Sequence, residues 1–339
     1  MKKCNLIKKK AGEDIKLIAK MMWHRICVSA RLFFLGQWKR VWLNRRSIFD
    51  TKRQMLAETI DRSEIVIISP PHTQYIANIV KNELTKSGHT IYMCQNFSRK
   101  RDRGQLHIVI APQVYRYFPW NFVAYQVEQL EASHWLTKRY FCLLERAMKV
   151  FDYSMRNINL LKEIGYCCPD KLHFSPICPA ENYAEDVLGL DNCRGEKDID
   201  ILFYGTMSSE RRKRYLGELK KHFNVQIITK AFGDEIYPWI QRAKIVVNIH
   251  YYENALLETT RISEALSLGA VIVSEKSVDA DICEEFGEAV IFAPVGDVDE
   301  FVEKCGELLN NNEKYNEQVL KVGSFISNGT HRFVFSIEE

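Results

Sequence analysis

The sequence lacks the features of a secreted protein. Residues 1–10 contain no apolar core of the kind that a secretory signal needs. Ten cysteines are present, but they include no CxxC pair and no regular disulfide framework. Several of them lie within apolar segments, where a free thiol behaves as a small hydrophobe. We therefore expect a reducing, cytoplasmic environment and no bound metal.

Acidic residues are scarce only at the N-terminal end. Residues 1–53 hold 15 Lys or Arg against 3 Asp or Glu, whereas the remainder holds 32 against 40. Residues 15–42 mix aromatic and aliphatic side chains with cations, and their apolar runs fall far short of the roughly 18 residues of a spanning helix.

This composition favours an amphipathic helix lying on an anionic membrane surface, the inner face of the cytoplasmic membrane. Packing of the same segment on the globular part is an equally good interpretation. Nucleic-acid binding is disfavoured, because no nucleic-acid motif accompanies the charge.

The rest of the sequence alternates between strand-like and helix-like segments. Apolar runs predict strands over 65–69, 90–94, 106–111, 122–126 and 150–153, and again over 200–204, 225–229, 244–250, 270–273 and 289–294. Helical spacing between them predicts parallel sheets covered by helices on both faces. Residues 179–198 lose this periodicity and predict a connector. The expected architecture is α/β, with a basic helical segment (1–55) and two doubly wound Rossmann-like domains (56–185 and 196–327) facing a cleft.

One candidate ligand site follows the strand predicted over 244–250. Glu258, Arg261 and Glu264 are spaced i, i+3 and i+6, so they share one face of the next helix. Thr259 and Thr260 lie in its first turn, where unpaired N–H groups and the positive dipole end attract anions. This set suits a sugar phosphate, with carboxylates for ribose hydroxyls and Arg261 for negative charge. The alternative is that Arg261 only pairs with Glu258 or Glu264.

A second candidate site follows the strand predicted over 200–204. Gly205 and Thr206 come directly after this strand, and a glycine there lets the backbone approach a ligand closely. Arg211 and Arg212 fall in the first turns of the next helix, where cations are unfavourable to the helix dipole. We expect a bound diphosphate to compensate for this placement.

Two loops of the first domain offer a general base. His72 follows the strand predicted over 65–69, and an imidazole there titrates near neutrality. Glu128 follows the strand predicted over 122–126. The alternatives are a rigid proline turn at His72 and a helix-capping role for Glu128.

Glu264, Ala265 and Gly269 form an EAxxxG segment directly before a buried strand. With the order of elements over 198–309, this segment resembles the donor-binding domain of GT-B glycosyltransferases, the group 1 type. The resemblance implies that Glu264 contacts the ribose of the donor. That family has another Glu eight positions earlier in a glycine-rich loop, but Leu256 stands there and the glycines are absent. Glu258, or the turn formed by Thr259, Thr260 and Arg261, would then take its part.

The resemblance implies a GT-B fold, a UDP- or GDP-sugar donor in the second domain, an acceptor in the first, and no catalytic metal. We therefore predict a glycosyltransferase that adds a sugar to a hydroxyl of a glycan or lipid-linked acceptor in surface polysaccharide or glycoconjugate synthesis. His72 or Glu128 is the predicted base if the reaction inverts, and no nucleophile can be named if it retains. Two alternatives remain, namely a nucleotide-sugar epimerase or hydrolase of the same fold and a non-catalytic membrane-associated scaffold.

Overall fold

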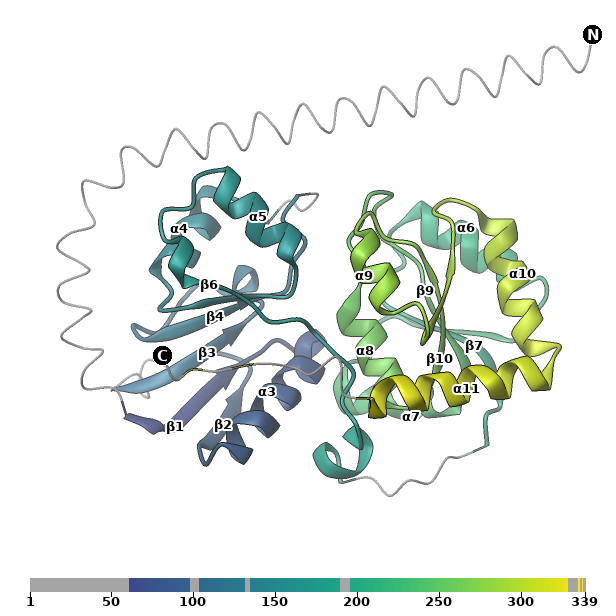
Figure 1. Ribbon diagram of the computed structural model, residues 1–339, viewed down its shortest axis with the longest axis horizontal. Coiled ribbons are helices and arrows are strands. Elements are labelled where there is room, and N and C mark those ends of the chain that lie inside the picture. Colours follow the sequence, from purple (N-terminus) through teal and green to yellow (C-terminus); the bar gives the residue numbers. More distant parts are fainter. Residues whose placement is uncertain are drawn as a thin grey trace, which may run out of the picture.

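The computed structural model describes residues 61–97, 104–131, 135–189 and 196–328, together with Phe335 and Ile337. The basic segment 1–55, and the membrane-facing helix expected within it, lie outside these residues. Among the described helices, none is both long and apolar enough to cross a membrane. Figure 1 shows two lobes side by side, each built around one sheet flanked by helices.

The N-terminal lobe is built on six parallel strands in the order β2-β1-β3-β4-β5-β6. All five residues of β4 are buried, as expected for a parallel strand covered on both faces. The strands are β1 (Asp61–Ile68), β2 (Thr90–Cys94), β3 (Gln105–Ile110), β4 (Phe122–Gln126), β5 (Val150–Asp152) and β6 (Leu172–Phe174). The main helices are α3 (Gln74–Lys86), α4 (Lys138–Arg146) and α5 (Met155–Glu163).

The C-terminal lobe is built on five parallel strands in the order β11-β10-β9-β7-β8. Its strands are β7 (Ile199–Tyr204), β8 (Val225–Ile228), β9 (Ala243–Asn248), β10 (Val271–Glu275) and β11 (Val290–Ala293). Its helices are α6 (Glu210–Leu219), α7 (Tyr237–Arg242), α8 (Thr259–Ser267), α9 (Ala280–Glu285), α10 (Val298–Leu309) and α11 (Asn312–Ser327).

The strand order places a ligand crevice in each lobe. In the C-terminal lobe, the chain runs from β7 to β8 on one side and then returns to β9 on the other. The loops that leave the carboxyl ends of β7 and β9 therefore diverge to opposite faces of the sheet and leave a crevice between them. The N-terminal lobe repeats this arrangement between β1 and β3.

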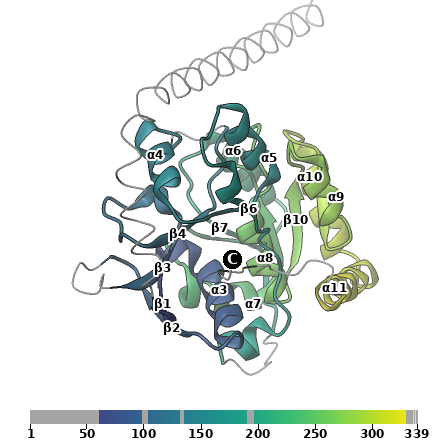
Figure 2. The same ribbon diagram turned by 60° about the vertical axis from the view of Figure 1, so that its left-hand side comes forward.

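The two lobes share a buried interface on which α3 and α8 lie next to one another (Figure 2). Tyr75 of α3 is 1% exposed, and its hydroxyl lies 2.8 Å from both the Cys178 carbonyl and the Ser267 hydroxyl. Apolar residues of both lobes belong to one continuous core cluster along this interface. Phe335 returns to the N-terminal lobe, where its ring lies 4.3 Å from that of Phe151.

A turn in the connector and a short strand are among the elements that the sequence did not predict. The connector holds a π-helical turn, η6 (Tyr183–Val187), and Tyr183 is fully buried. Its hydroxyl accepts from Asn78 at 3.0 Å and lies 2.9 Å from the Tyr237 hydroxyl, so the connector is packed against both lobes. Strand β6 has only three residues, none of them buried, and carries no period that marks a strand.

Candidate functional site

The carboxyl ends of strands from both lobes meet at a cavity of about 470 Å³ between the lobes. This cavity gathers nearly all the residues that the sequence nominated. The N-terminal lobe contributes His72 and Glu128, and the C-terminal lobe contributes Gly205, Thr206, Arg212, Glu258, Thr259, Thr260, Arg261 and Glu264. Residues up to 192 positions apart in the sequence thus line one space.

Gly205 adopts a backbone conformation that disfavours other residues. Its φ is +138°, and a Cβ atom built there would lie 3.0 Å from Nη2 of Arg261 and 3.7 Å from Nη1 of Arg212. Both guanidinium groups therefore lie against the turn that follows β7. A larger residue at this position would push them away from it.

Arg212 is 3% exposed and is held by three acceptors. Its Nε donates to the Ile249 carbonyl at 2.9 Å, its Nη1 to the Thr206 carbonyl at 3.1 Å and its Nη2 to Glu258 at 2.8 Å. The guanidinium also lies over the Tyr251 ring, with 5.4 Å to the ring centre. Burial lowers the pKa of Arg212 to about 10, so the group remains charged at neutral pH.

Arg261 lies beside Arg212 at the N-terminal end of α8. Its Nη1 donates to Oδ1 of Asn248 at 2.6 Å, and the guanidinium forms an ion pair with Glu258. Burial first, and the charge of Arg212 second, lower the pKa of Arg261 to about 9. Arg261 is therefore also a cation at neutral pH, held close to a second cation in a region with little water.

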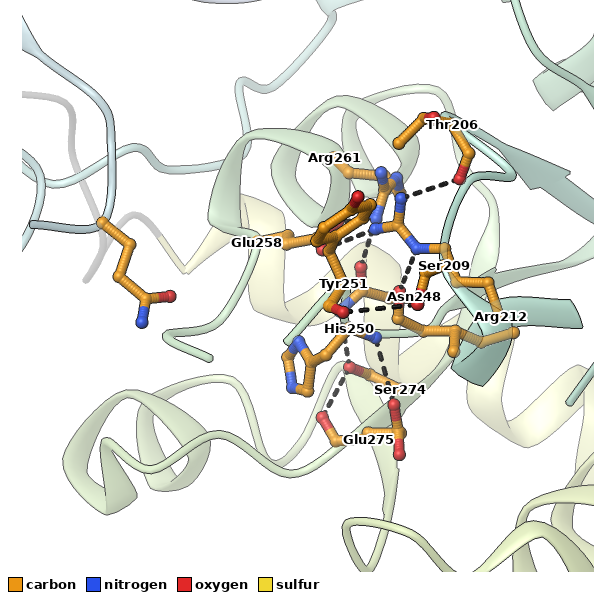
Figure 3. A network of polar contacts seen from close by, with 12 residues as sticks. Thr206, Ser209, Arg212, Asn248, His250, Tyr251, Glu258, Arg261, Ser274 and Glu275 are labelled. Carbon is orange, nitrogen blue, oxygen red and sulfur yellow. Dashed lines mark hydrogen bonds and ion pairs between the residues drawn. The ribbon is translucent and has the colours of Figure 1, made fainter. Parts of the chain in front are cut away.

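Glu258 bridges the two guanidinium groups, as Figure 3 shows. It occupies the N-cap position of α8, but its side chain accepts no capping hydrogen bond because both arginines engage it. The structure therefore contains the ion pair between Arg261 and Glu258 that the alternative interpretation predicted. One carboxylate is thus shared by two cations.

The first turn of α8 keeps some of its polar groups unsatisfied. Thr259 is 4% exposed and lines the cavity, and its Oγ1 has no hydrogen-bond partner among the described residues. Nε of Arg261 likewise finds no partner within this part of the chain. Buried donors without acceptors, at the positive end of a helix, are what an anion would satisfy.

Glu264 lies one turn further along α8 and is 8% exposed. The Tyr204 hydroxyl donates to its Oε2 at 2.9 Å. Burial raises the pKa of Glu264 to about 7, although Tyr204 and Arg261 counteract part of that rise. The carboxyl group thus changes charge near neutral pH while facing the cavity.

Arg211 does not belong to this site, which corrects the expectation from the sequence. It is absent from the cavity wall and pairs instead with Glu275, a fully buried residue at the end of β10. Glu275 also accepts from the backbone N–H groups of His250 and Gly296. The unfavourable position of Arg211 near the helix start is therefore compensated within the protein, and no diphosphate is needed there.

His72 lies on the opposite wall, in the turn η2 (Pro71–Thr73) after β1. Its ring lies 6.1 Å from that of Phe232 in an edge-to-face arrangement, so it contacts the C-terminal lobe. Its side chain is exposed on the cavity wall, and partial desolvation there lowers the pKa of the imidazole from its ordinary value. The imidazole is therefore neutral at pH 7 and able to accept a proton.

Glu128 lies in a loop whose backbone is held by hydrogen bonds to Gln126 and Asn157. Its N–H donates to Oε1 of Gln126 at 2.5 Å, and its carbonyl accepts from Nε2 of Gln126 at 2.6 Å. Asn157 donates to the same carbonyl at 3.0 Å. These three contacts involve the backbone of Glu128, and the N-cap of α4, the next described helix, is Thr137.

Sequence reasoning missed three residues that shape the cavity. Asn248 ends β9 and orients Arg261, Tyr204 ends β7 and holds Glu264, and Gln129 reaches across the cleft to the loop after β9. Each occupies the end of a predicted strand or the loop after it. A search for polar side chains at every strand end would have found them.

The second lobe matches a known family. Residues 190–326 match the family model described as glycosyl transferase-like. An uncharacterized protein of Acanthamoeba polyphaga mimivirus is 30% identical over 182 residues, which cover 52% of this chain and 59% of that protein. The chain thus spans about three fifths of the length of this curated relative.

Solved structures with a similar fold include named glycosyltransferases. An alpha-glucosyltransferase bound to UDP and a 13-mer DNA has a TM-score of 0.55 at 12% identity, covering 80% of this chain and 96% of that one. Anabaena HepE with UDP and glucose has a TM-score of 0.50 at 11% identity, covering 80% and 95%. WaaG, a glycosyltransferase involved in lipopolysaccharide biosynthesis, has a TM-score of 0.50 at 10% identity, covering 79% and 95%.

These likenesses confirm the predicted fold. The described chain has the GT-B architecture, with two parallel α/β lobes, and its C-terminal lobe matches the glycosyl transferase-like family model.

Proposed function

We propose that this chain transfers a sugar from a UDP- or GDP-sugar to a hydroxyl group of an acceptor. The observation that carries the proposal is the pair of buried guanidinium groups, Arg212 and Arg261, beside Gly205 in the cavity between the lobes. Two adjacent cations and unsatisfied donors at a helix N-terminus suit a diphosphate better than any neutral ligand.

The residues that contact the donor would then all come from the C-terminal lobe. The diphosphate oxygens would accept hydrogen bonds from Arg212, Arg261 and the first turn of α8, where Thr259 and Thr260 lie. The Glu264 carboxylate would accept hydrogen bonds from the ribose hydroxyls. As the bond between the anomeric carbon and the diphosphate oxygen breaks, these cations would stabilise the departing nucleoside diphosphate.

The acceptor would approach from the N-terminal lobe. Its hydroxyl oxygen would form a bond to the anomeric carbon, and its proton would move to a base. His72 is neutral at pH 7 and lines the cavity, and Glu128 lines the same wall, so either side chain would serve in an inverting reaction. For a retaining reaction, we propose no nucleophile.

We propose a glycan or a lipid-linked sugar as the acceptor, in the synthesis of surface polysaccharide or glycoconjugate. The basic segment 1–53 would hold the enzyme on an anionic membrane at its cytoplasmic face, close to a lipid-linked acceptor. We propose no nucleic-acid partner. The two buried arginines would supply the positive charge that other enzymes obtain from a metal, so catalysis would be metal-independent.

The test is the release of nucleoside diphosphate from a panel of UDP- and GDP-sugars, with alkyl glycosides as acceptors. We expect one donor to be consumed, with equal rates in the presence and absence of EDTA. Arg261→Gln should abolish the release, whereas Lys213→Gln, which removes an exposed charge from the first turn of α6, should not. Consumption that yields only free sugar or an epimer would favour the hydrolase or epimerase alternative.

A further inference from the structure

Gln129 of the N-terminal lobe makes two hydrogen bonds across the cleft. Its Oε1 accepts from the backbone N–H of Leu256 at 2.8 Å, and its Nε2 donates to the backbone carbonyl of Asn254 at 3.1 Å. One carboxamide thus satisfies a donor and an acceptor of the loop that follows β9. These contacts do not depend on the side chains of that loop, and they fix its backbone directly.

The backbone around Gln129 is anchored on a buried polar platform. On one side, Gln126 holds the N–H and the carbonyl of Glu128, and on the other, the N–H of Leu130 donates to Oδ1 of Asn157 at 3.1 Å. Gln126 and Asn157 both donate to the Asp152 carboxyl group, at 3.1 Å and 3.0 Å. Asp152 and Gln126 are fully buried, and Asn157 is 1% exposed.

The loop that Gln129 holds directly precedes the cavity wall that contains Arg212 and Arg261. Asn254 and Leu256 precede Glu258, which bridges Arg212 and Arg261. Leu256 is 3% exposed and lines the cavity. A displacement of this loop would therefore shift the N-terminal end of α8, where Thr259, Thr260 and Arg261 line the cavity.

We propose that Gln129 is a positioning residue that makes the donor site of one lobe depend on contact with the other. It holds the loop 254–258 in the arrangement that places the N-terminal end of α8 at the cavity. When the lobes separate, both hydrogen bonds are lost and the loop is freed. The inference rests on the proposed function, because it assigns the arginines to a nucleotide diphosphate.

The first measurement is hydrogen exchange of the peptide 250–258 without any ligand. In Gln129→Ala, the Leu256 amide loses its acceptor, and we expect its exchange to be about tenfold faster. Gln129→Glu keeps an acceptor oxygen and should retain the protection of Leu256. Gln105→Ala is the matched control, because Gln105 begins β3 in the same lobe, at the end of the strand away from the cavity, and its Nε2 donates to Glu64 at 2.9 Å.

The second measurement is the dissociation constant of UDP and of GDP for the same variants. We expect Gln129→Ala to raise the dissociation constant of the nucleotide that binds the wild type by about tenfold. That is the effect of losing two neutral hydrogen bonds. Gln129→Glu should recover most of the affinity, and Gln105→Ala should match the wild type.

The two measurements separate the inference from the proposed function. Equal exchange of 250–258 in Gln129→Ala and the wild type overturns the inference, whether or not a nucleotide binds. A faster exchange with an unchanged nucleotide affinity also overturns it, because the loop would then not control the site. Failure of both nucleotides to bind the wild type contradicts the proposed function, and the exchange result still decides the role of Gln129 in holding the loop.

Discussion

Among single residues, Glu258 has the most unusual position in the site. It shares its carboxylate between two guanidinium groups, and it lies where an incoming diphosphate would have to bind. The same carboxylate therefore has two opposing effects. It stabilises the free protein by separating two buried cations, and it competes with the anion that those cations would bind.

This opposition predicts the behaviour of Glu258→Gln. The free protein should lose about 1–2 kcal/mol of unfolding free energy, less than for a fully buried pair because the Glu258 side chain is 25% exposed. The affinity for nucleoside diphosphate should rise, since the competing carboxylate is gone. Thermal unfolding and calorimetric titration of the same sample measure both effects. A variant that lost stability and affinity together would contradict this account of Glu258.

Glu264 adds a dependence on pH. Burial raises its pKa to about 7 in the folded protein, above the ordinary value near 4.5, so the folded state retains a proton that the unfolded chain releases. Stability from this group is therefore full below pH 4.5 and falls as the pH rises through 7. Hydrogen bonds from ribose hydroxyls favour the ionised carboxylate, so nucleotide affinity should increase as the pH rises.

We expect nucleotide affinity to increase about ninefold between pH 6 and pH 8, as roughly one tenth and then nine tenths of Glu264 is ionised. Glu264→Gln should lose this dependence and retain only the titration of the nucleotide itself. Titrations of both proteins at the two pH values provide the measurement. An equal pH dependence in wild type and variant would place the titrating group elsewhere.

At the level of elements, the turn between β7 and α6 sets the approach of both guanidinium groups. Glycine is the only residue type that fits at position 205 without strain, because φ there is +138° and a built Cβ would lie 3.0 Å from Nη2 of Arg261. Gly217 provides the contrast within α6, because a Cβ there meets nothing within 4 Å.

Gly205→Ala should therefore lower the free energy of unfolding by about 1–3 kcal/mol and weaken nucleotide binding. Gly217→Ala should raise the free energy of unfolding by about 0.5–1 kcal/mol, because alanine favours a helix more than glycine does. Denaturant unfolding of the two variants measures the difference. Similar effects of both substitutions would show that the turn is more permissive than its geometry indicates.

The sequence predicted those elements whose signal is local. The buried strands β4 and β9 show as apolar runs, and Gly205 and Glu264 stand at fixed places relative to such runs. The pairing of Arg211 with Glu275 was not predictable, because it joins residues 64 positions apart, one in α6 and one at the end of β10. The same holds for η6, which is stabilised by Tyr237 and Asn78 from different lobes and not by its own periodicity.

For the molecule as a whole, the site exists only because two lobes meet. The cations and Glu264 come from the C-terminal lobe, whereas His72, Glu128 and Gln129 come from the N-terminal lobe. A nucleotide held by one lobe would thereby meet an acceptor and a base held by the other. This division accounts for a cavity with cations on one wall and two proton acceptors on the other.

The central claim is that the cations of this cavity bind a nucleoside diphosphate. Calorimetric titration of UDP and GDP, with uridine and guanosine alongside, into wild type, Arg261→Gln and Lys213→Gln tests it most directly. We expect one of the two diphosphates to bind the wild type. Arg261→Gln should lower the affinity for this diphosphate by about 30-fold and change the affinity for the nucleoside little, and Lys213→Gln should behave as the wild type. Equal diphosphate affinities of Arg261→Gln and the wild type would contradict the account.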